Sequence, residues 1–98
     1  MPRFAAIDWG TSHRRVFVID ADGTVIRREA DDHGILAVSD FPAEVGALRA
    51  RLGDLPVLMA GMIGSSRGWH EVPYVSAPAG LDALAASIVT VAPGIWIV

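Results

Sequence analysis

The dipeptide Asp22-Gly23 constrains the fold most strongly, because it lies between two runs of strand-forming residues. Residues 15–20 (RVFVID) are almost continuously apolar and contain β-branched and aromatic members, as expected for a central strand. Residues 24–30 (TVIRREA) carry charges that suit the edge of a sheet. Glycine accepts the positive φ of a tight hairpin turn, so the two runs are predicted to pair antiparallel.

The rest of the chain alternates short apolar runs with amphipathic segments. One helix is expected between Asp40, which can cap it, and Gly53, which ends it; a second is expected over residues 81–89. The remaining strands are expected at three apolar runs, residues 4–8, 56–60 and 95–98. Hairpins force antiparallel pairing and helical crossovers force parallel pairing. The order βββαβαβ therefore predicts an α/β fold with a five-stranded mixed sheet.

Composition excludes several classes of function. The chain has 98 residues, 52% of them hydrophobic, which suits one domain with a core. A net charge of -3 argues against nucleic-acid binding, and the absence of lysine excludes a P-loop. Without cysteine, disulfides and thiolate metal sites are excluded. No run is long and apolar enough for a signal peptide or a membrane span, so we expect a soluble, cytoplasmic protein that contacts no membrane.

A group of polar residues follows the first apolar run at one turn: Asp8, Gly10, Thr11 and Ser12. Backbone N–H groups that converge in a turn hold a phosphate well, and the two hydroxyls add donors. Asp8 would repel a phosphate directly, but it could hold a hydrated Mg²⁺ ion, which takes few protein ligands. Spacing alone is equally compatible with a plain β-turn after a strand that ends in an aspartate.

Three segments resemble the 2-dehydro-3-deoxygalactonokinase family: AIDWGTSHRRVFVID, HGILAV and PVLMAGMIGSSRGWHEVPYVSAPAG. The pattern D-x-G-T-S-x-x-R, from Asp8 to Arg15, also resembles the first phosphate motif of the sugar kinase, Hsp70 and actin superfamily. The chain departs from the expected pattern at His13 and Arg14. The resemblance implies an RNase H-like (actin-like ATPase) half-domain and ATP, with Mg²⁺, as cofactor. It also implies transfer of the γ-phosphoryl group to the 6-hydroxyl of 2-dehydro-3-deoxy-D-galactonate, in galactonate catabolism.

Proteins of this family are several-fold longer, so residues 1–98 are expected to be an N-terminal half-domain without the ATP-binding half. The apolar end of the chain, residues 95–98, also favours a fragment. No acid apart from Asp8 is a convincing participant in the chemistry, so we expect the general base to lie outside this chain. The 98-residue fragment is therefore expected to lack kinase activity, and a homo-oligomer is left open.

The residues after the fourth predicted strand have the composition of a sugar-acid site. An arginine can hold a carboxylate bidentately, an aromatic ring covers an apolar face, and polar groups read hydroxyls. The candidates are Ser65, Arg67, Trp69, Glu71 and Tyr74, with Arg67 assigned to the carboxylate. Equally, Trp69 and Tyr74 could anchor the loop to the core, and Arg67 could be solvated surface. His33-Gly34 is a further candidate for the cleft, whereas Asp31-Asp32 are expected to be solvated charge.

Two other functions fit the expected fold. An RNase H-like nuclease would also place an aspartate on its first strand, but two-metal catalysis needs further carboxylates that converge on it. The fourth strand leads into AGMIGS without an acid, and Glu44 alone is insufficient. A non-catalytic actin-like or Hsp70-like nucleotide-binding half would have no use for the sugar-reading loop. The sequence therefore favours the sugar kinase.

Overall fold

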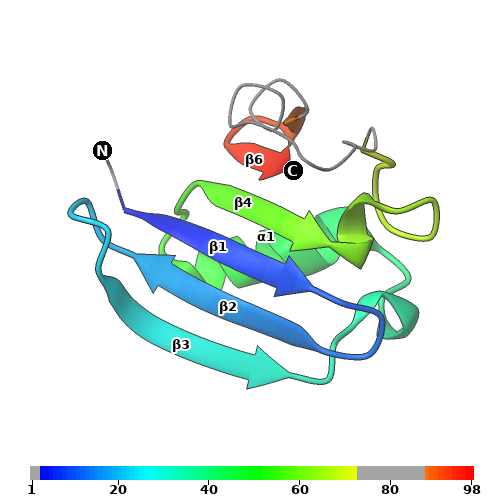
Figure 1. Ribbon diagram of the computed structural model, residues 1–98, viewed down its shortest axis with the longest axis horizontal. Coiled ribbons are helices and arrows are strands. Elements are labelled where there is room, and N and C mark those ends of the chain that lie inside the picture. Colours follow the sequence, from blue (N-terminus) through cyan, green and yellow to red (C-terminus); the bar gives the residue numbers. More distant parts are fainter. Residues whose placement is uncertain (1–2, 73–87) are drawn as a thin grey trace, which may run out of the picture.

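The computed structural model describes residues 3–72 and 88–98, in which one mixed sheet forms the centre (Figure 1). The strands, in the spatial order β3-β2-β1-β4-β6-β5, are β1 (Phe4–Trp9), β2 (Arg14–Ile19), β3 (Val25–Asp31), β4 (Val57–Gly61), β5 (Val89–Ala92) and β6 (Ile95–Ile97). Antiparallel pairing joins β1 to β2 and β2 to β3, while β4 runs parallel to both β1 and β6. The predicted α/β fold with a mixed sheet is confirmed.

The predicted number of strands is wrong, because the described part of the chain contains six. The additional strand, β5, begins at Val89, the last residue of the helix that apolar spacing predicts over residues 81–89. β-branched residues dominate this run, and Pro93-Gly94 then turns the chain so that β5 pairs antiparallel with β6. The rest of the expected helix, residues 81–87, lies outside the described residues.

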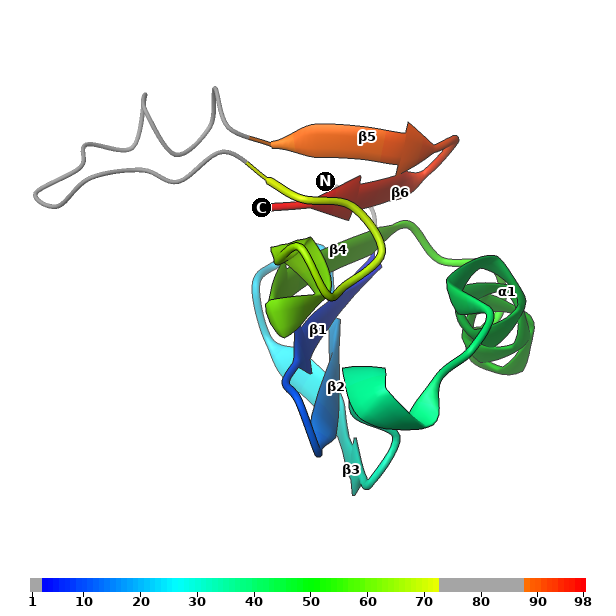
Figure 2. The ribbon, with the colours of Figure 1, turned by 90° about the vertical axis from the view of Figure 1, so that its right-hand side faces the viewer.

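Helix α1 (Phe41–Leu52) forms where the sequence predicts it. Its N-cap is Asp40, whose Oδ1 accepts a hydrogen bond of 3.0 Å from the backbone N–H of Ala43. Val45 and Leu48 are buried and face the sheet. Figure 2 shows that α1 covers one face of the sheet. No helix among the described residues is long and apolar enough to cross a membrane.

The core lies between α1 and this face of the sheet. Side chains alternate along a strand, and the buried members are Ala5, Ile7 and Trp9 on β1, Val16 and Val18 on β2, Val57 and Met59 on β4, and Ile95 and Ile97 on β6. The intervening residues point to the opposite face, where Asp8 and Arg15 are exposed neighbours across β1 and β2. The end of the β1–β2 hairpin thus presents charge on the face away from α1.

Candidate functional site

The turn between β1 and β2 is closed by its own backbone. The N–H of Gly10 donates a hydrogen bond of 2.9 Å to the carbonyl oxygen of His13. This bond leaves Thr11 and Ser12 at the tip of the turn, where both are exposed. The two hydroxyls are therefore available to a ligand, as the phosphate interpretation of the turn requires.

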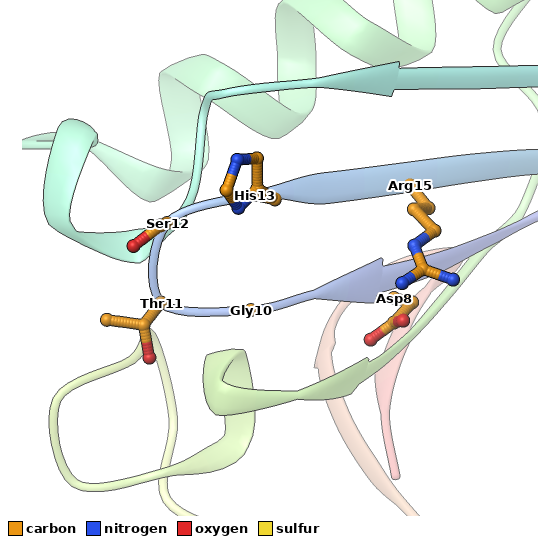
Figure 3. Close-up of a pocket in the computed structure, with 6 residues that line it drawn as sticks. All are labelled: Asp8, Gly10, Thr11, Ser12, His13 and Arg15. Atoms are coloured by element: carbon orange, nitrogen blue, oxygen red, sulfur yellow. The ribbon is translucent and has the colours of Figure 1, made fainter.

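An open cavity of about 310 Å³ lies beside this turn (Figure 3). Its lining comprises Asp8, Gly10, Thr11, Ser12, His13 and Arg15. The structure thus brings together all five residues that the sequence assigned to cofactor binding. His13 is a member that sequence reasoning did not assign to binding, although its place in the turn could have indicated it. Whether these residues bind a ligand stays a prediction.

The cavity offers both signs of charge. Asp8 and Arg15 are cross-strand neighbours, yet no ion pair joins them in the described part of the chain. The guanidinium and the hydroxyls can donate to an anion, while the exposed carboxylate can meet a cation. Nowhere in residues 3–72 and 88–98 do three His, Cys, Asp or Glu side chains form a group that could hold a metal ion. A lone carboxylate such as Asp8 could contribute to the coordination of a hydrated cation, and whether it does so stays a prediction.

A glycine on β4 keeps the side of Asp8 open. Gly61 pairs with Trp9 at the end of the parallel strands β1 and β4. Its φ of +100° is unfavourable for other residues, and a Cβ there would lie 2.8 Å from the carbonyl oxygen of Trp9 and 3.3 Å from Oδ1 of Asp8. The loop after β4 consequently starts directly beside Asp8. The candidate phosphate turn and the candidate sugar loop share one edge of the sheet (Figure 1).

The loop after β4 begins with the short 3₁₀ helix η2 (Met62–Gly64). Ser65 helps to shape the turn that follows, since its Oγ donates to the carbonyl oxygen of Met62 at 2.6 Å and accepts from the N–H of Arg67 at 3.2 Å. The side chains of Arg67 and Glu71 are exposed. Trp69 is half-buried and packs against the core, which is the anchoring alternative that the sequence left open.

The structure leaves the sugar-binding assignments as predictions. Ser65, Arg67, Trp69 and Glu71 all lie in the loop after β4, and Tyr74 lies outside the described residues. His33 does not line the cavity beside Asp8. It lines a second cavity, of about 410 Å³, with Arg14, Asp31, Glu44, Ala47, Leu48 and Arg51.

The expectation for Asp31 is wrong. Asp31 is half-buried rather than fully solvated, because it forms an ion pair with the buried Arg14 at 2.8 Å. Partial burial opposes ionisation of Asp31, but hydrogen bonds from Arg14 and from the N–H of His33 outweigh burial and lower the pKa of its carboxyl. Strand alternation places Arg14 on the buried face of β2, and this is the signal in the sequence that could have indicated a buried partner for Asp31.

Comparisons with known proteins give one consistent result. A family model described as 2-keto-3-deoxy-galactonokinase matches residues 8–98. A 2-dehydro-3-deoxygalactonokinase from Escherichia coli (strain K12) is 33% identical over 99 residues, which cover 98% of this chain and 34% of that protein. A protein from Rhizobium meliloti (strain 1021), named as a probable enzyme of the same kind, is 36% identical over 87 residues, or 84% of this chain and 28% of that protein.

A solved structure agrees with these sequence matches. A crystal structure from Sinorhizobium meliloti, described under the same enzyme name, superposes with a TM-score of 0.81 at 29% identity. The match covers 96% of this chain and 33% of that one. The chain thus spans about a third of the length of the relatives that it matches.

Proposed function

The chain belongs to the 2-keto-3-deoxy-galactonokinase family, and we propose that it is the N-terminal part of a longer, cytoplasmic sugar-acid kinase. The longer protein would transfer the γ-phosphoryl group of ATP to the 6-hydroxyl of 2-dehydro-3-deoxy-D-galactonate. Within it, residues 1–98 would form an RNase H-like, actin-like ATPase half-domain. Three antiparallel strands followed by two parallel ones, in the order β3-β2-β1-β4-β6, support this architecture.

One observation carries the proposal: the cavity at the β1–β2 turn opens at the sheet edge from which the candidate sugar loop also departs. Phosphoryl transfer depends on holding a phosphate and an attacking hydroxyl close together. Parallel pairing of β1 with β4 supplies that proximity, because the carboxyl ends of the two strands lie side by side.

The residues around the cavity fit a nucleotide phosphate with its magnesium ion. When bound, ATP with Mg²⁺ supplies the phosphoryl group and neutralises part of its charge. Thr11 and Ser12 would donate hydroxyl hydrogen bonds to phosphate oxygens, and Arg15 would add a charged donor from the neighbouring strand. Asp8 would hold the hydrated cation. We place the general base outside this chain, since Asp8 is the sole carboxylate that lines this cavity in the described residues.

The loop after β4 would hold the sugar acid. Arg67 is exposed, and its guanidinium would pair with the substrate carboxylate. The rest of the sugar would be contacted, or its binding site shaped, by Ser65, Trp69, Glu71 and Tyr74. The core contact of Trp69 supports a role in which the ring fixes the loop while one part of it stays accessible.

A two-metal nuclease is a weaker fit to this site. Its chemistry needs several carboxylates that converge on the first-strand aspartate. In the described part of the chain, no acid other than Asp8 lines the cavity. A single carboxylate beside hydroxyl donors and an arginine is better suited to one hydrated cation and an anion.

The direct test is an assay of the longer protein with ATP, Mg²⁺ and 2-dehydro-3-deoxy-D-galactonate. We expect ADP release that depends on the sugar acid, and a product whose phosphorus is coupled to the protons on carbon 6 in ³¹P NMR. The 98-residue chain assayed alone should give no turnover. Hydrolysis of ATP that ignores the sugar acid, or phosphate on another hydroxyl, would overturn the assignment.

A further inference from the structure

A segment after β3 is hydrogen-bonded to the candidate phosphate turn. It comprises residues 33–36 and includes the start of the 3₁₀ helix η1 (Ile35–Ala37). The N–H of Ile35 donates to the carbonyl oxygen of Gly10 at 2.9 Å, and the N–H of Leu36 donates to that of Thr11 at 3.2 Å. The indole Nε1–H of Trp9 donates to the carbonyl oxygen of His33 at 2.8 Å. Three hydrogen bonds therefore join this segment to the turn.

These bonds decide which way the N–H groups of the turn point. In a planar trans peptide, the carbonyl of one residue and the N–H of the next point in opposite directions. Because the carbonyl oxygens of Gly10 and Thr11 are directed at residues 33–36, the N–H groups of Thr11 and Ser12 are directed away from them. Neither N–H donates to an acceptor within the described residues. The segment thus leaves two backbone donors for the side of the turn where a ligand would lie.

Gly34 makes the close approach of the two backbones geometrically feasible. A Cβ at this position would lie 2.3 Å from the carbonyl oxygen of Thr11 and 2.4–2.5 Å from backbone atoms of Ser12. Such distances cannot be relieved by rotation of a side chain, because the three nearest atoms all belong to the backbone. Any larger residue must push the segment and the turn apart.

An ion cluster fixes the segment from the other side. Arg14, the first residue of β2, is 4% exposed and pairs with Asp31 at 2.8 Å and with Glu44 of α1 at 3.1 Å. The same two carboxylates bind the segment: Oδ1 of Asp31 accepts from the N–H of His33 at 2.9 Å, and Oε1 of Glu44 lies 3.1 Å from Nδ1 of His33. The guanidinium of Arg14 also lies 5.1 Å from the ring of Trp9. Both ends of the turn, Trp9 and Arg14, are thereby connected to residues 33–36.

We propose that residues 33–36 act as a backbone clamp that orients the N–H donors of the candidate phosphate turn, and that Arg14, Asp31 and Glu44 hold this clamp in place. These residues are positioning residues, since none of them lines the cavity beside Asp8. The inference deepens the proposed function and rests on the turn as the phosphate-holding element. It assigns residues 33–36 a positioning role toward the turn that their sequence alone did not reveal.

The first measurement uses the 98-residue chain and does not depend on kinase activity. Backbone amide hydrogen exchange is followed by NMR for Ile35 and Leu36, with amides of β4 as an internal reference. Trp9→Phe keeps an aromatic ring but removes the bond to His33, and we expect roughly three- to tenfold faster exchange at both amides. Gly34→Ala should have a larger effect. The matched control is Gly46→Ala on α1, where a Cβ meets nothing within 4 Å.

The second measurement uses the longer protein and separates binding from folding. For Trp9→Phe and Glu44→Gln, we expect the KM for ATP to rise several-fold while the KM for the sugar acid stays unchanged. Gly46→Ala should leave both values as in the wild type. A purely structural loss would lower the amount of active enzyme and leave both KM values in place.

The outcomes distinguish the clamp from the kinase assignment. Unchanged exchange at Ile35 and Leu36 in Trp9→Phe overturns the clamp, whatever the enzyme does; this variant decides if Gly34→Ala fails to fold. Faster exchange with an unchanged KM for ATP also overturns it, because the clamp would then not set the phosphate site. Absence of any kinase activity in the wild type overturns the proposed function and with it the role of the turn, even where the exchange data confirm the three contacts.

Discussion

Replacement of Arg14 by methionine removes the charge at the centre of the ion cluster and keeps an apolar side chain of similar length. The arginine side chain is 5% exposed, and its partners Asp31 and Glu44 are 29% and 28% exposed. Breaking a fully buried pair costs about 3–5 kcal/mol, and breaking an exposed one costs about 0–1 kcal/mol. With a buried cation and carboxylates that water reaches in part, we expect a loss of about 2–3 kcal/mol in the free energy of unfolding. The Tm of a chain of this size would fall by roughly 10–20 °C.

Urea and thermal unfolding of the 98-residue chain at pH 7, followed by circular dichroism, measure this loss. Arg15→Met is the matched control, since Arg15 is the next residue of β2 but is exposed on the opposite face. It should change stability by less than about 0.5 kcal/mol. Equal losses for the two variants would refute the reasoning, because they would show that burial of the Arg14 cluster has no energetic consequence.

The pH dependence of the free energy of unfolding, compared between wild type and Arg14→Met, gives a second check. The pKa of Asp31 is lowered in the folded chain from its ordinary value of 3.8: partial burial opposes ionisation, but hydrogen bonds from Arg14 and the His33 N–H prevail. A carboxyl with a depressed pKa contributes stability above its unfolded pKa and loses it as pH falls through the folded pKa. The difference in free energy of unfolding between wild type and Arg14→Met should therefore be largest above about pH 4 and become smaller below it.

Three further outcomes are expected. In the longer protein, Asp8→Asn should lower kcat at least tenfold with a much smaller change in the KM for the sugar acid. The control Asp54→Asn, which does not line the cavity, should change neither value. An unchanged kcat in Asp8→Asn would contradict the role of Asp8 in metal binding. Arg67→Ala should raise the KM for the sugar acid roughly tenfold or more, as loss of a charged hydrogen bond implies, and a normal KM would contradict the carboxylate assignment. A hydrogen bond to Glu44 raises the pKa of His33 above its ordinary 6.5. The contribution of this hydrogen bond to stability is therefore present below pH 6.5 and lost as pH rises through the folded pKa. NMR titration of His33 should give a midpoint above 6.5 in wild type and a lower one in Glu44→Gln.

The regular elements near the first turn were predictable because each carries a local signal. Short apolar runs marked β1 and β2, the second with β-branched and aromatic residues, and Asp22-Gly23 marked the hairpin to β3. A cap at Asp40 and a stop at Gly53 bounded α1. β5 was missed because Val89 continues the apolar spacing of the preceding segment, so helical periodicity and strand propensity compete at the same residues. Pairing with β6, which sequence spacing does not reveal, decides in favour of the strand.

The residues of the candidate site also divide into those that a local sequence pattern reveals and those that it does not. Asp8, Gly10, Thr11, Ser12 and Arg15 were found together because they are contiguous at one turn, and the structure gathers them around one cavity. Gly34 was not connected to that turn, since its contact with Thr11 and Ser12 depends on how the chain returns after β3. A contact that joins backbone atoms leaves no side-chain pattern in the sequence.

Arg14 shows what strand alternation could have revealed. Val16 and Val18 are buried on β2, so a period of two places Arg14 on the same buried face and Arg15 on the other. A buried arginine requires anionic partners, which predicts that acids reach this face from elsewhere in the chain. Asp31 and Glu44, 17 and 30 residues away, fill that requirement. One residue step along β2 therefore separates two sites of different character. An ion cluster that stabilises the fold lies on one face, and an open cavity lined by the exposed Arg15 lies on the other. The turn that both sites flank joins them.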